Sequence, residues 1–501
     1  MESLMTIRPE LLGLGLAEQT ALMPYLAVTA GCVLAIIVSV IKFLNPKWTT
    51  FLVCLAACCA GVALSVEGLH GGSLNLFNDM MVIDGYAAFF HIVFLVSAAV
   101  TLLVSLRYLD HEGLQHPEYY VLVLFSALGM MLMASAKDLI VFFVALETMS
   151  LAVYSLVGFR RADRRSNEAA MKYFILGGAA SAVLLYGVAL IYGITGSTHI
   201  SVILNAVVSQ QASASPLFSV GLWLLVAGFL FKVASVPFHM WMPDVYEGAP
   251  VPVTGFMTTG LKAAAFAAFV RVFISMGYGK GLAQGVENHL HDILWVCAVL
   301  TMVAGNVIAL TQTNLKRILA YSSIAHTGYI MVGLIAAPHA PDGYSSILLY
   351  LAAYAVMNLG AFVVLTLLAG RGDEGLNLHD LSGVARRNPV LAFGMAVFLF
   401  SMAGVPPTAG FVAKYLLLYS AVQAGEVPLV VIAVLCSAVS VYYYLRVLVY
   451  MYMREPVAGT VAARVPFWSM VAMAAMVLVT LQVGLLPAPL VEIARRAVQG
   501  L

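Results

Sequence analysis

The chain has 501 residues, of which 62% are hydrophobic and only 10% are charged, and its mean hydropathy is +0.97. Ordinary soluble proteins carry about 25% charged residues, so this composition excludes a soluble globular protein and indicates a membrane protein with many spans. The formal net charge of +1 argues against nucleic acid as a partner, because binding a polyanion needs a concentrated basic face.

The first residues, MESLMTIRPELL, lack the basic start, short apolar core and small-residue cleavage site of a secretory signal. We therefore expect the first span to be retained. Apolar stretches of about 20 residues are long enough to cross a bilayer as helices, and the sequence predicts an all-α polytopic membrane protein with about fourteen of them. They fall near 21–43, 48–66, 85–106, 119–136, 138–158, 169–194, 216–247, 252–275, 292–311, 318–337, 344–369, 390–424, 428–453 and 464–486.

Two of the predicted spans are too long for one simple helix. The seventh contains VPFHMWMP and the twelfth contains AGVPPTAG. Proline removes a backbone donor and breaks a helix, and lipid tolerates the freed backbone groups only where they face protein or a water-filled cavity. Both spans are therefore predicted to be interrupted.

Ionisable residues lie at about mid-depth in several spans. Glu147, Lys262 and His326 fall near the middle of spans five, eight and ten, while Lys232 and Lys414 lie beside the two predicted breaks. A lysine at the centre of a membrane helix costs roughly 2.5 to 3.5 kcal/mol, so such residues are functional candidates. A row of five at one height is what a charge relay along the membrane would need.

Spans four to eight and nine to thirteen form two blocks of five, each with its broken helix in fourth place. Five is odd, so the second block begins on the opposite side of the membrane, which is the inverted-repeat arrangement of transporters. The predicted divisions are three N-terminal spans (1–110), a first repeat (119–275), a second repeat (292–453) and a last span (464–486).

Basic residues in the short loops predict the orientation. Most of them lie in odd-numbered loops, whereas the even-numbered loops contain Lys137 and Lys280. The odd loops are therefore predicted to be cytoplasmic and both termini periplasmic, although Arg495 and Arg496 after the last span point the other way.

Four segments resemble one family. They are EAAMKYFILGG at 168–178, VPFHMWMPDVYEGAPVPV at 236–253, LKRILAYSSIAHTGYI at 315–330 and AGVPPTAGFVAKYLLL at 403–418. Spans four to fourteen resemble the antiporter-like proton-translocating subunits of NADH:quinone oxidoreductase, respiratory complex I. Lys414 distinguishes the chain from the type that has a glutamate at that place.

The resemblance implies a multi-pass subunit of the bacterial inner membrane, with other membrane-arm subunits, both antiporter-like and small, as its partners. It also implies that this chain binds no cofactor or metal, since NAD, flavin, iron–sulfur clusters and quinone belong to other subunits. The sequence contains no dinucleotide-binding glycine motif, phosphate-binding loop or CxxC pair.

The resemblance also pairs Glu147 with Lys232, so that movement of the carboxylate would switch the proton affinity of the lysine. The alternative for Glu147 is a protonated, hydrogen-bonded packing residue. For Lys232, Lys262 and Lys414 the alternative is snorkelling to an interface. His326 is either a proton shuttle or a packing histidine.

Five further residues are secondary candidates. His239 either caps the broken helix or lines a half-channel. Lys172 and Glu168, one helical turn apart, are most simply a surface ion pair but are also candidates for proton uptake. Asp244 and Glu247, near the end of span seven, either feed protons inward or bind a neighbouring subunit.

The predicted function is proton translocation coupled to electron transfer from NADH to quinone in other subunits. The path would run from a cytoplasmic half-channel near spans seven and eight through Lys232, Lys262 and His326, and would end near Lys414. The alternatives are a subunit of a multi-subunit sodium/proton antiporter, which shares this fold, and a purely structural spacer.

Overall fold

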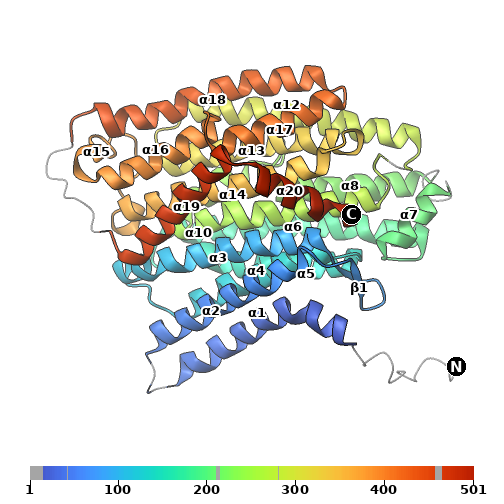
Figure 1. The fold of residues 1–501 in the computed structure, drawn as a ribbon, viewed down its shortest axis with the longest axis horizontal. Coiled ribbons are helices and arrows are strands. Elements are labelled where there is room, and N and C mark those ends of the chain that lie inside the picture. The colour runs from blue at the N-terminus through green and yellow to red at the C-terminus, as the bar shows by residue number, and fades with distance from the viewer. Residues whose placement is uncertain (1–14, 42, 44, 210–214, 280, 457–464) are drawn as a thin grey trace.

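Long apolar helices make up most of the chain and lie side by side along one direction (Figure 1). This computed structural model describes residues 15–41, 43, 45–209, 215–279, 281–456 and 465–501. The N-terminal segment considered as a secretory signal and the loop residue Lys280 lie outside these ranges.

Within the described ranges, twelve helical stretches are long and apolar enough to cross a membrane. They are α1 (Leu16–Val40), α2 (Pro46–Gly68), α3 (Gly85–Glu112), α4 (Glu118–Ser135), α5 (Leu139–Val157), α6 (Arg164–Thr195), the continuous stretch formed by α10 (Val251–Phe256), η3 (Met257–Leu261) and α11 (Lys262–Ser275), α12 (Gln284–Thr311), α13 (Leu315–Ala336), α14 (Gly343–Leu368), α18 (Val427–Met453) and α19 (Phe467–Leu485).

The other two spans are interrupted, as predicted. The seventh consists of α8 (Pro216–Lys232) and α9 (Trp241–Gly248), and the twelfth of α16 (Pro389–Ala403) and α17 (Ala409–Gln423). The prolines in both connections cannot donate to the helical ladder, and Gly404 ends α16 with a φ of +87°, a left-handed value that glycine adopts without steric cost. Together with the twelve continuous spans, these two confirm the predicted fourteen.

Polar residues fix where several spans begin. Asp84 accepts a hydrogen bond from the backbone of α3, Asp138 from the first turn of α5, and Asn314 from the first turn of α13. Aspartate and asparagine are favoured at this position because the first amides of a helix have no partner within it. These caps explain helix starts that hydropathy alone places only to within several residues.

The middle of the bundle is formed by the eighth, tenth and eleventh spans, whose apolar segments are almost completely buried. The eighth span is not a uniform α-helix, because η3 is a π-helical turn that ends directly before Lys262. Such single turns are frequent at functional sites. The sequence did not predict this turn.

Contacts between loops define the two ends of the bundle. At one end, Arg160 and Lys316 both contact Asp373, which joins odd-numbered loops; we call it the Asp373 end. At the other end, even-numbered loops meet around the hairpin of β1 (Leu74–Leu76) and β2 (Met81–Ile83); we call it the hairpin end. The odd-numbered loops thus lie at one end of the bundle and the even-numbered loops at the other, as expected if every span crosses the membrane once.

Asp79 in the hairpin binds Lys137 at 2.8 Å and Ser201 at 3.1 Å. Partial burial alone would raise the pKa of Asp79, but the hydrogen bond and charge of Lys137 outweigh burial and hold this pKa below its ordinary value. The hairpin end is therefore fastened by an ionised carboxylate.

Several short elements were not predicted. They are the two strands, α7 (Ile200–Val208), η4 (Ala337–His339), η5 (Arg371–Asp373), α15 (Val384–Arg387), α20 (Ala488–Ala497) and η6 (Val498–Gly500). Arg495 on α20 makes a two-pronged contact with Asp342 at 2.9 and 2.8 Å. The arginines after the last span, which opposed the predicted orientation, therefore belong to a helix docked against the hairpin-end loop before α14.

Candidate functional site

Lys262, at the start of α11, is the most enclosed of the three predicted lysines, with 3% of its surface exposed. Its ammonium lies 2.5 Å from both the carbonyl and the hydroxyl oxygen of Ser323 and 2.9 Å from the hydroxyl of Thr327. The nitrogen also lies 5.5 Å from the ring centroid of Tyr354. Every acceptor is a neutral group, and because the ammonium ends among these buried partners it does not snorkel to an interface.

Thr327 connects Lys262 to the break in the seventh span. Its hydroxyl accepts from Lys262 and donates to the carbonyl of Val233 at 2.8 Å. Val233 directly follows Lys232, the last residue of α8. Thr327 therefore joins Lys262 to the backbone next to Lys232, whose own ammonium is bound elsewhere.

Lys232 is buried, and its ammonium donates to the hydroxyl of Ser150 on α5 at 3.1 Å. Ser150 lies three residues after Glu147, which places the two on one face of the helix. Glu147 accepts a hydrogen bond from Ser181 on α6 at 2.5 Å. In the described structure each of the two binds a serine and no hydrogen bond or ion pair joins them directly, but the carboxylate lies near enough to act on Lys232 through its charge.

His326 lies beside Thr327 on α13 and is almost completely buried. Its Nδ1 lies 2.7 Å from the hydroxyl of Tyr350, and its Nε2 lies 3.3 Å from that of Tyr444. A hydroxyl can donate or accept, so either neutral tautomer of the ring is satisfied at both nitrogens. Tyr444, on α18, is also hydrogen-bonded to Ser322, which leads the chain of hydroxyl groups back to α13.

Lys414, on α17, reaches back across the break in the twelfth span. Its ammonium donates to the carbonyls of Met402 at 2.8 Å and Ala403 at 3.3 Å, and to the hydroxyl of Ser437 at 3.0 Å. Its nitrogen lies 5.2 Å from the ring centroid of Tyr329, one turn after His326 on α13. The lysine is buried, so it does not snorkel either.

These contacts place α13 at the centre of the candidate site. On this helix, Ser323 and Thr327 bind Lys262, and His326 directly precedes Thr327. One turn later, the ring of Tyr329 lies beside the ammonium of Lys414. We call the series Glu147, Lys232, Lys262, His326 and Lys414 the buried row, in which the last four are buried and Glu147 is half-buried. From Lys262 to Lys414, the aromatic rings of Tyr354 and Tyr329 lie between successive members.

The secondary candidates form an ion-pair network at the Asp373 end. Lys172 binds Glu168 at 2.9 Å, as predicted, and also binds Asp244 at 3.0 Å. Arg317 on α13 then joins Asp244 at 3.1 Å to Glu247 at 2.8 Å. The network is partly exposed, whereas His239 lies apart from it in the connection between α8 and α9.

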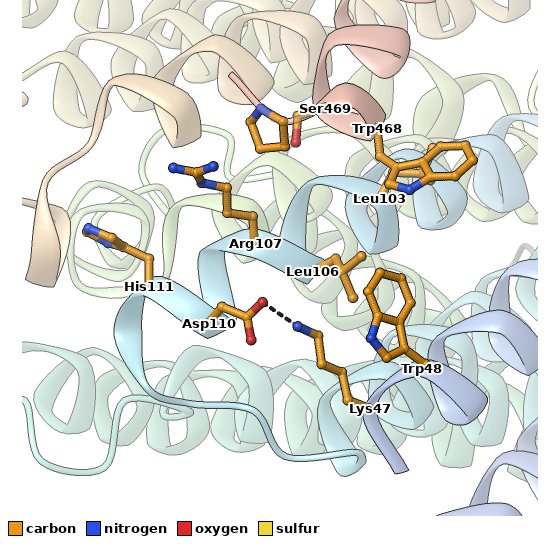
Figure 2. Close-up of a pocket in the computed structure, with 10 residues that line it drawn as sticks. Lys47, Trp48, Leu103, Leu106, Arg107, Asp110, His111, Trp468 and Ser469 are labelled. Carbon is orange, nitrogen blue, oxygen red and sulfur yellow. Dashed lines mark hydrogen bonds and ion pairs between the residues drawn. The ribbon is translucent and has the colours of Figure 1, made fainter. Parts of the chain in front are cut away.

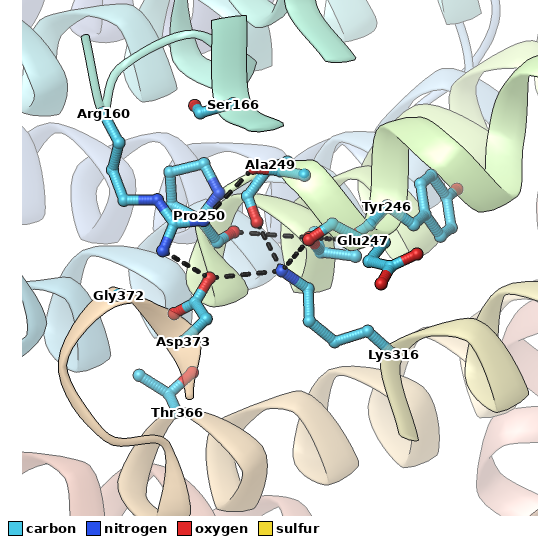
Figure 3. Close-up of polar contacts among 12 residues, drawn as sticks. Arg160, Ser166, Tyr246, Glu247, Ala249, Pro250, Lys316, Thr366, Gly372 and Asp373 are labelled. Carbon is cyan, nitrogen blue, oxygen red and sulfur yellow. Dashed lines mark hydrogen bonds and ion pairs between the residues drawn. The ribbon is translucent and has the colours of Figure 1, made fainter. Parts of the chain in front are cut away.

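A buried charge cluster at the Asp373 end was not predicted from the sequence. Figure 3 shows Arg160 and Lys316 approaching Asp373 from opposite sides, at 3.1 and 3.2 Å. Only 6%, 2% and 5% of the side chains of Arg160, Lys316 and Asp373 are exposed. In the sequence these basic residues are recognisable only as orientation signals, because nothing marks Asp373 in its distant loop as their partner.

The same cluster fixes the end of the broken seventh span. Lys316 donates to the carbonyls of Glu247 at 2.7 Å and Ala249 at 2.5 Å, and Arg160 donates to that of Gly248 at 3.2 Å (Figure 3). The carbonyls at the end of α9 would otherwise have no partner. One loop aspartate therefore ties both halves of the molecule to the interrupted helix.

A second missed pair lies toward the hairpin end. Arg271 on α11 binds Asp84, the N-cap of α3, through two hydrogen bonds of 2.9 and 2.8 Å, and both residues are buried. Its guanidinium lies 4.7 Å from the ring centroid of Tyr86. This pair joins the N-terminal spans to the helix that carries Lys262. The sequence signal that could have revealed this pair was Arg271 itself, a charged residue inside an apolar span.

Comparison with known proteins agrees with this architecture. Residues 136–442 match the family described as "NADH:quinone oxidoreductase/Mrp antiporter, TM". The chain is 48% identical to the NADH-quinone oxidoreductase subunit N of Trichlorobacter lovleyi, over 77% of each chain. It is 41% identical to subunit N 2 of Rhizobium meliloti, over 95% of this chain and 96% of that one.

Solved structures show the same fold. A chain of respiratory complex I from Thermus thermophilus matches with a TM-score of 0.79 and 33% identity, covering 94% of this chain and 100% of that chain. A chain of the Mrp complex from Dietzia matches with a TM-score of 0.83 at 23% identity, covering 97% of both. The family inferred from the four motifs is confirmed: the chain belongs to the antiporter-like membrane subunits of NADH:quinone oxidoreductase and the Mrp antiporters.

Proposed function

We propose that the chain is a proton-translocating membrane-arm subunit of an NADH:quinone oxidoreductase, of the subunit N type. The observation that carries the proposal is the buried row, in which three lysines and a histidine are held by neutral groups next to two broken helices. Three buried lysines are costly in a membrane, and packing alone gives no reason to keep them. The subunit N relatives provide the context of the complex.

Protons enter, in this proposal, near Lys172 and Asp244 at the Asp373 end and pass to Lys232. They then move through Thr327 to Lys262, and through His326 and its tyrosines to the region of Lys414. Each proton exported against 100 mV requires about 2.3 kcal/mol. Neighbouring subunits of the membrane arm supply that work.

Glu147 acts as the gate of this path. In the described arrangement Ser181 holds its carboxylate, and Lys232 is bound to Ser150 instead. A rotation of Glu147 toward Lys232 would stabilise the protonated lysine by direct attraction. A return to Ser181 would favour transfer of that proton toward Lys262.

The same proposal includes the orientation of the chain in the membrane and the assignment of the cofactors to other subunits. The Asp373 end faces the cytoplasm and both termini face the periplasm. The three N-terminal spans (1–110) support two inverted repeats, 119–275 and 292–453, and 464–486 forms the last span. NAD, flavin, iron–sulfur clusters and quinone bind to other subunits, while this chain contacts antiporter-like and small membrane subunits.

A subunit of a sodium/proton antiporter is the second candidate, and the likeness to the Mrp chain supports it at the level of fold. The experiment that separates the two uses the purified assembly in sealed proteoliposomes. NADH-driven proton movement supports our proposal. Sodium-for-proton exchange without NADH would support the antiporter and contradict it.

A further inference from the structure

A groove at the Asp373 end has no place in the proton path. It lies between the first turn of α2, the last turns of α3 and the first turn of α19 (Figure 2), with a volume of about 470 Å³. Arg107 and His111 lie on one side of the view in Figure 2, and Trp48 and Trp468 lie on the other. One wall of the groove is therefore basic and the other aromatic.

Arg107 gives the groove its unbalanced positive charge. The other strong cation in the lining, Lys47, forms an ion pair with Asp110, so these two charges cancel. The side chain of Arg107 is exposed and has no charged or hydrogen-bonded partner in the described part of the chain. An unpaired guanidinium presents several donors in a planar fork suited to phosphate oxygens.

Backbone and hydroxyl donors face the same space. Helices α2 and α19 both begin at the groove, and neither has a side-chain cap on its first amides. Helix N-termini favour anions. Ser469, in the first turn of α19, lines the groove, is 1% exposed, and has a hydroxyl without a hydrogen-bond partner among the described residues. This buried hydroxyl is an independent sign that an acceptor belongs here.

The apolar lining indicates what carries the anion. Trp48 and Trp468 are 42% and 46% exposed, and Leu103 and Leu106 complete the wall between the basic residues and the tryptophans. Tryptophan is enriched where membrane meets water, and basic pockets between spans suit acidic lipid headgroups. A free inorganic anion would leave this apolar wall unused.

We propose that the groove is a binding site for a membrane phospholipid with a net-negative headgroup. The phosphodiester is held by Arg107, Ser469 and the first amides of α19, and an acyl chain lies along Trp468 and Leu103. The groove shares no residue with the buried row, so lipid binding can fail while the proposed proton translocation stands.

The test uses the full-length chain, delipidated in detergent, with phosphatidylglycerol, phosphatidylcholine or inorganic phosphate added as probes. Thermal stabilisation gives the apparent affinity, and native mass spectrometry counts retained lipid. Phosphatidylglycerol should stabilise the wild-type chain most. Arg107→Gln should weaken its binding about tenfold, equivalent to ~1.4 kcal/mol, and Ser469→Ala about fivefold, as expected for loss of one neutral hydrogen bond. Arg161→Gln, at an exposed arginine in another loop of the same end, is the matched control and should bind like wild type.

The proposal is overturned if Arg107→Gln binds phosphatidylglycerol as wild type does, or if phosphatidylcholine binds equally well. It is also overturned if inorganic phosphate alone gives the same Arg107-dependent stabilisation, because the groove would then be a site for free anions.

Discussion

The ammonium of Lys414 donates to the carbonyl of Met402 at 2.8 Å and so closes the break in the twelfth span. Met402 belongs to the last turn of α16, whose carbonyls have no partners within the helix and carry the negative end of its dipole. The same lysine therefore holds a proton and fastens two half-helices. Loss of that proton would loosen the interrupted span, which couples the charge on Lys414 to the conformation of the break.

Replacing Lys414 with an uncharged or a charged side chain should show how much its positive charge, as distinct from its bulk, contributes at the break. We expect Lys414→Met to lower the stability of the chain by about 1.5 to 3 kcal/mol, because the α16 carbonyls lose charged hydrogen bonds, and to reduce proton pumping in the assembled complex. Lys414→Arg keeps the cation and should retain most of the stability. Thermal unfolding in detergent measures the first effect. Equal melting temperatures for wild type and Lys414→Met would refute the role of Lys414 at the break.

The hydroxyl of Thr327 should matter because it contacts both Lys262 and the carbonyl of Val233. Thr327→Val preserves shape and removes only the bridge. A hydrogen bond to a charged group contributes roughly 1.5 to 3 kcal/mol, so pumping should slow about tenfold in a fully assembled complex. Thr366→Val on α14, which removes a hydroxyl bound only to the backbone of its own helix, is the control. An unimpaired pumping rate in Thr327→Val would exclude this bridge from the path.

Ser181 should set the resting position of the Glu147 gate. Ser181→Ala removes the hydroxyl that binds the carboxylate, so Glu147 should spend more time near Lys232 and keep it protonated. We expect slower proton release, seen as a several-fold lower rate with a pH-sensitive dye, and no pumping at all in Glu147→Gln. Ser155→Ala, at an exposed serine on α5, should behave as wild type. A Ser181→Ala rate equal to that of the control would remove Ser181 from the gate.

Asp373 should be more important for stability than a loop aspartate usually is. Asp373→Asn leaves Lys316 and Arg160 buried without their carboxylate, and breaking a buried pair costs about 3 to 5 kcal/mol. The residue has a φ of +59°, which asparagine also tolerates, so the substitution tests charge and not backbone strain. The measurement is thermal unfolding beside Glu374→Gln, an exposed carboxylate in the same loop. Similar melting temperatures for the two variants would contradict the structural role of the cluster.

The sequence was most informative where a residue conflicts with its surroundings. A lysine such as Lys262 in an apolar helix, or Pro237 within a long span, is visible without coordinates because lipid penalises charge and unpaired backbone. The two breaks and the candidate lysines follow from such conflicts, whereas the fourteen spans follow from hydropathy and the family from the four segments that resemble it. The π-helical turn before Lys262 has no comparable signal, since it depends on how the eighth span packs against its neighbours.

Partner choice between segments that are distant in the sequence was the part that sequence could not predict. The pairing of Glu147 with Lys232 was an expectation, but the hydrogen bond that Ser181 from the next span donates to Glu147 was not, because a serine in an apolar helix gives no signal of its partner. The joining of Lys316 to Asp373 depends on which loops meet at one end of the bundle. Counting spans assigns each loop to one end of the bundle. Which residues of different loops contact each other at that end depends on how the helices pack, and the sequence does not reveal this.

The central claim is that the buried row carries protons, and Lys262 tests it most directly. The measurement is the number of protons moved per NADH oxidised in sealed vesicles, for the wild-type complex, for Lys262→Ala and for Lys137→Ala, a partly exposed lysine at the hairpin end. With assembly verified in all three, we expect the ratio to fall in Lys262→Ala and to stay at the wild-type value in Lys137→Ala. An unchanged ratio and rate in a fully assembled Lys262→Ala complex would contradict the account.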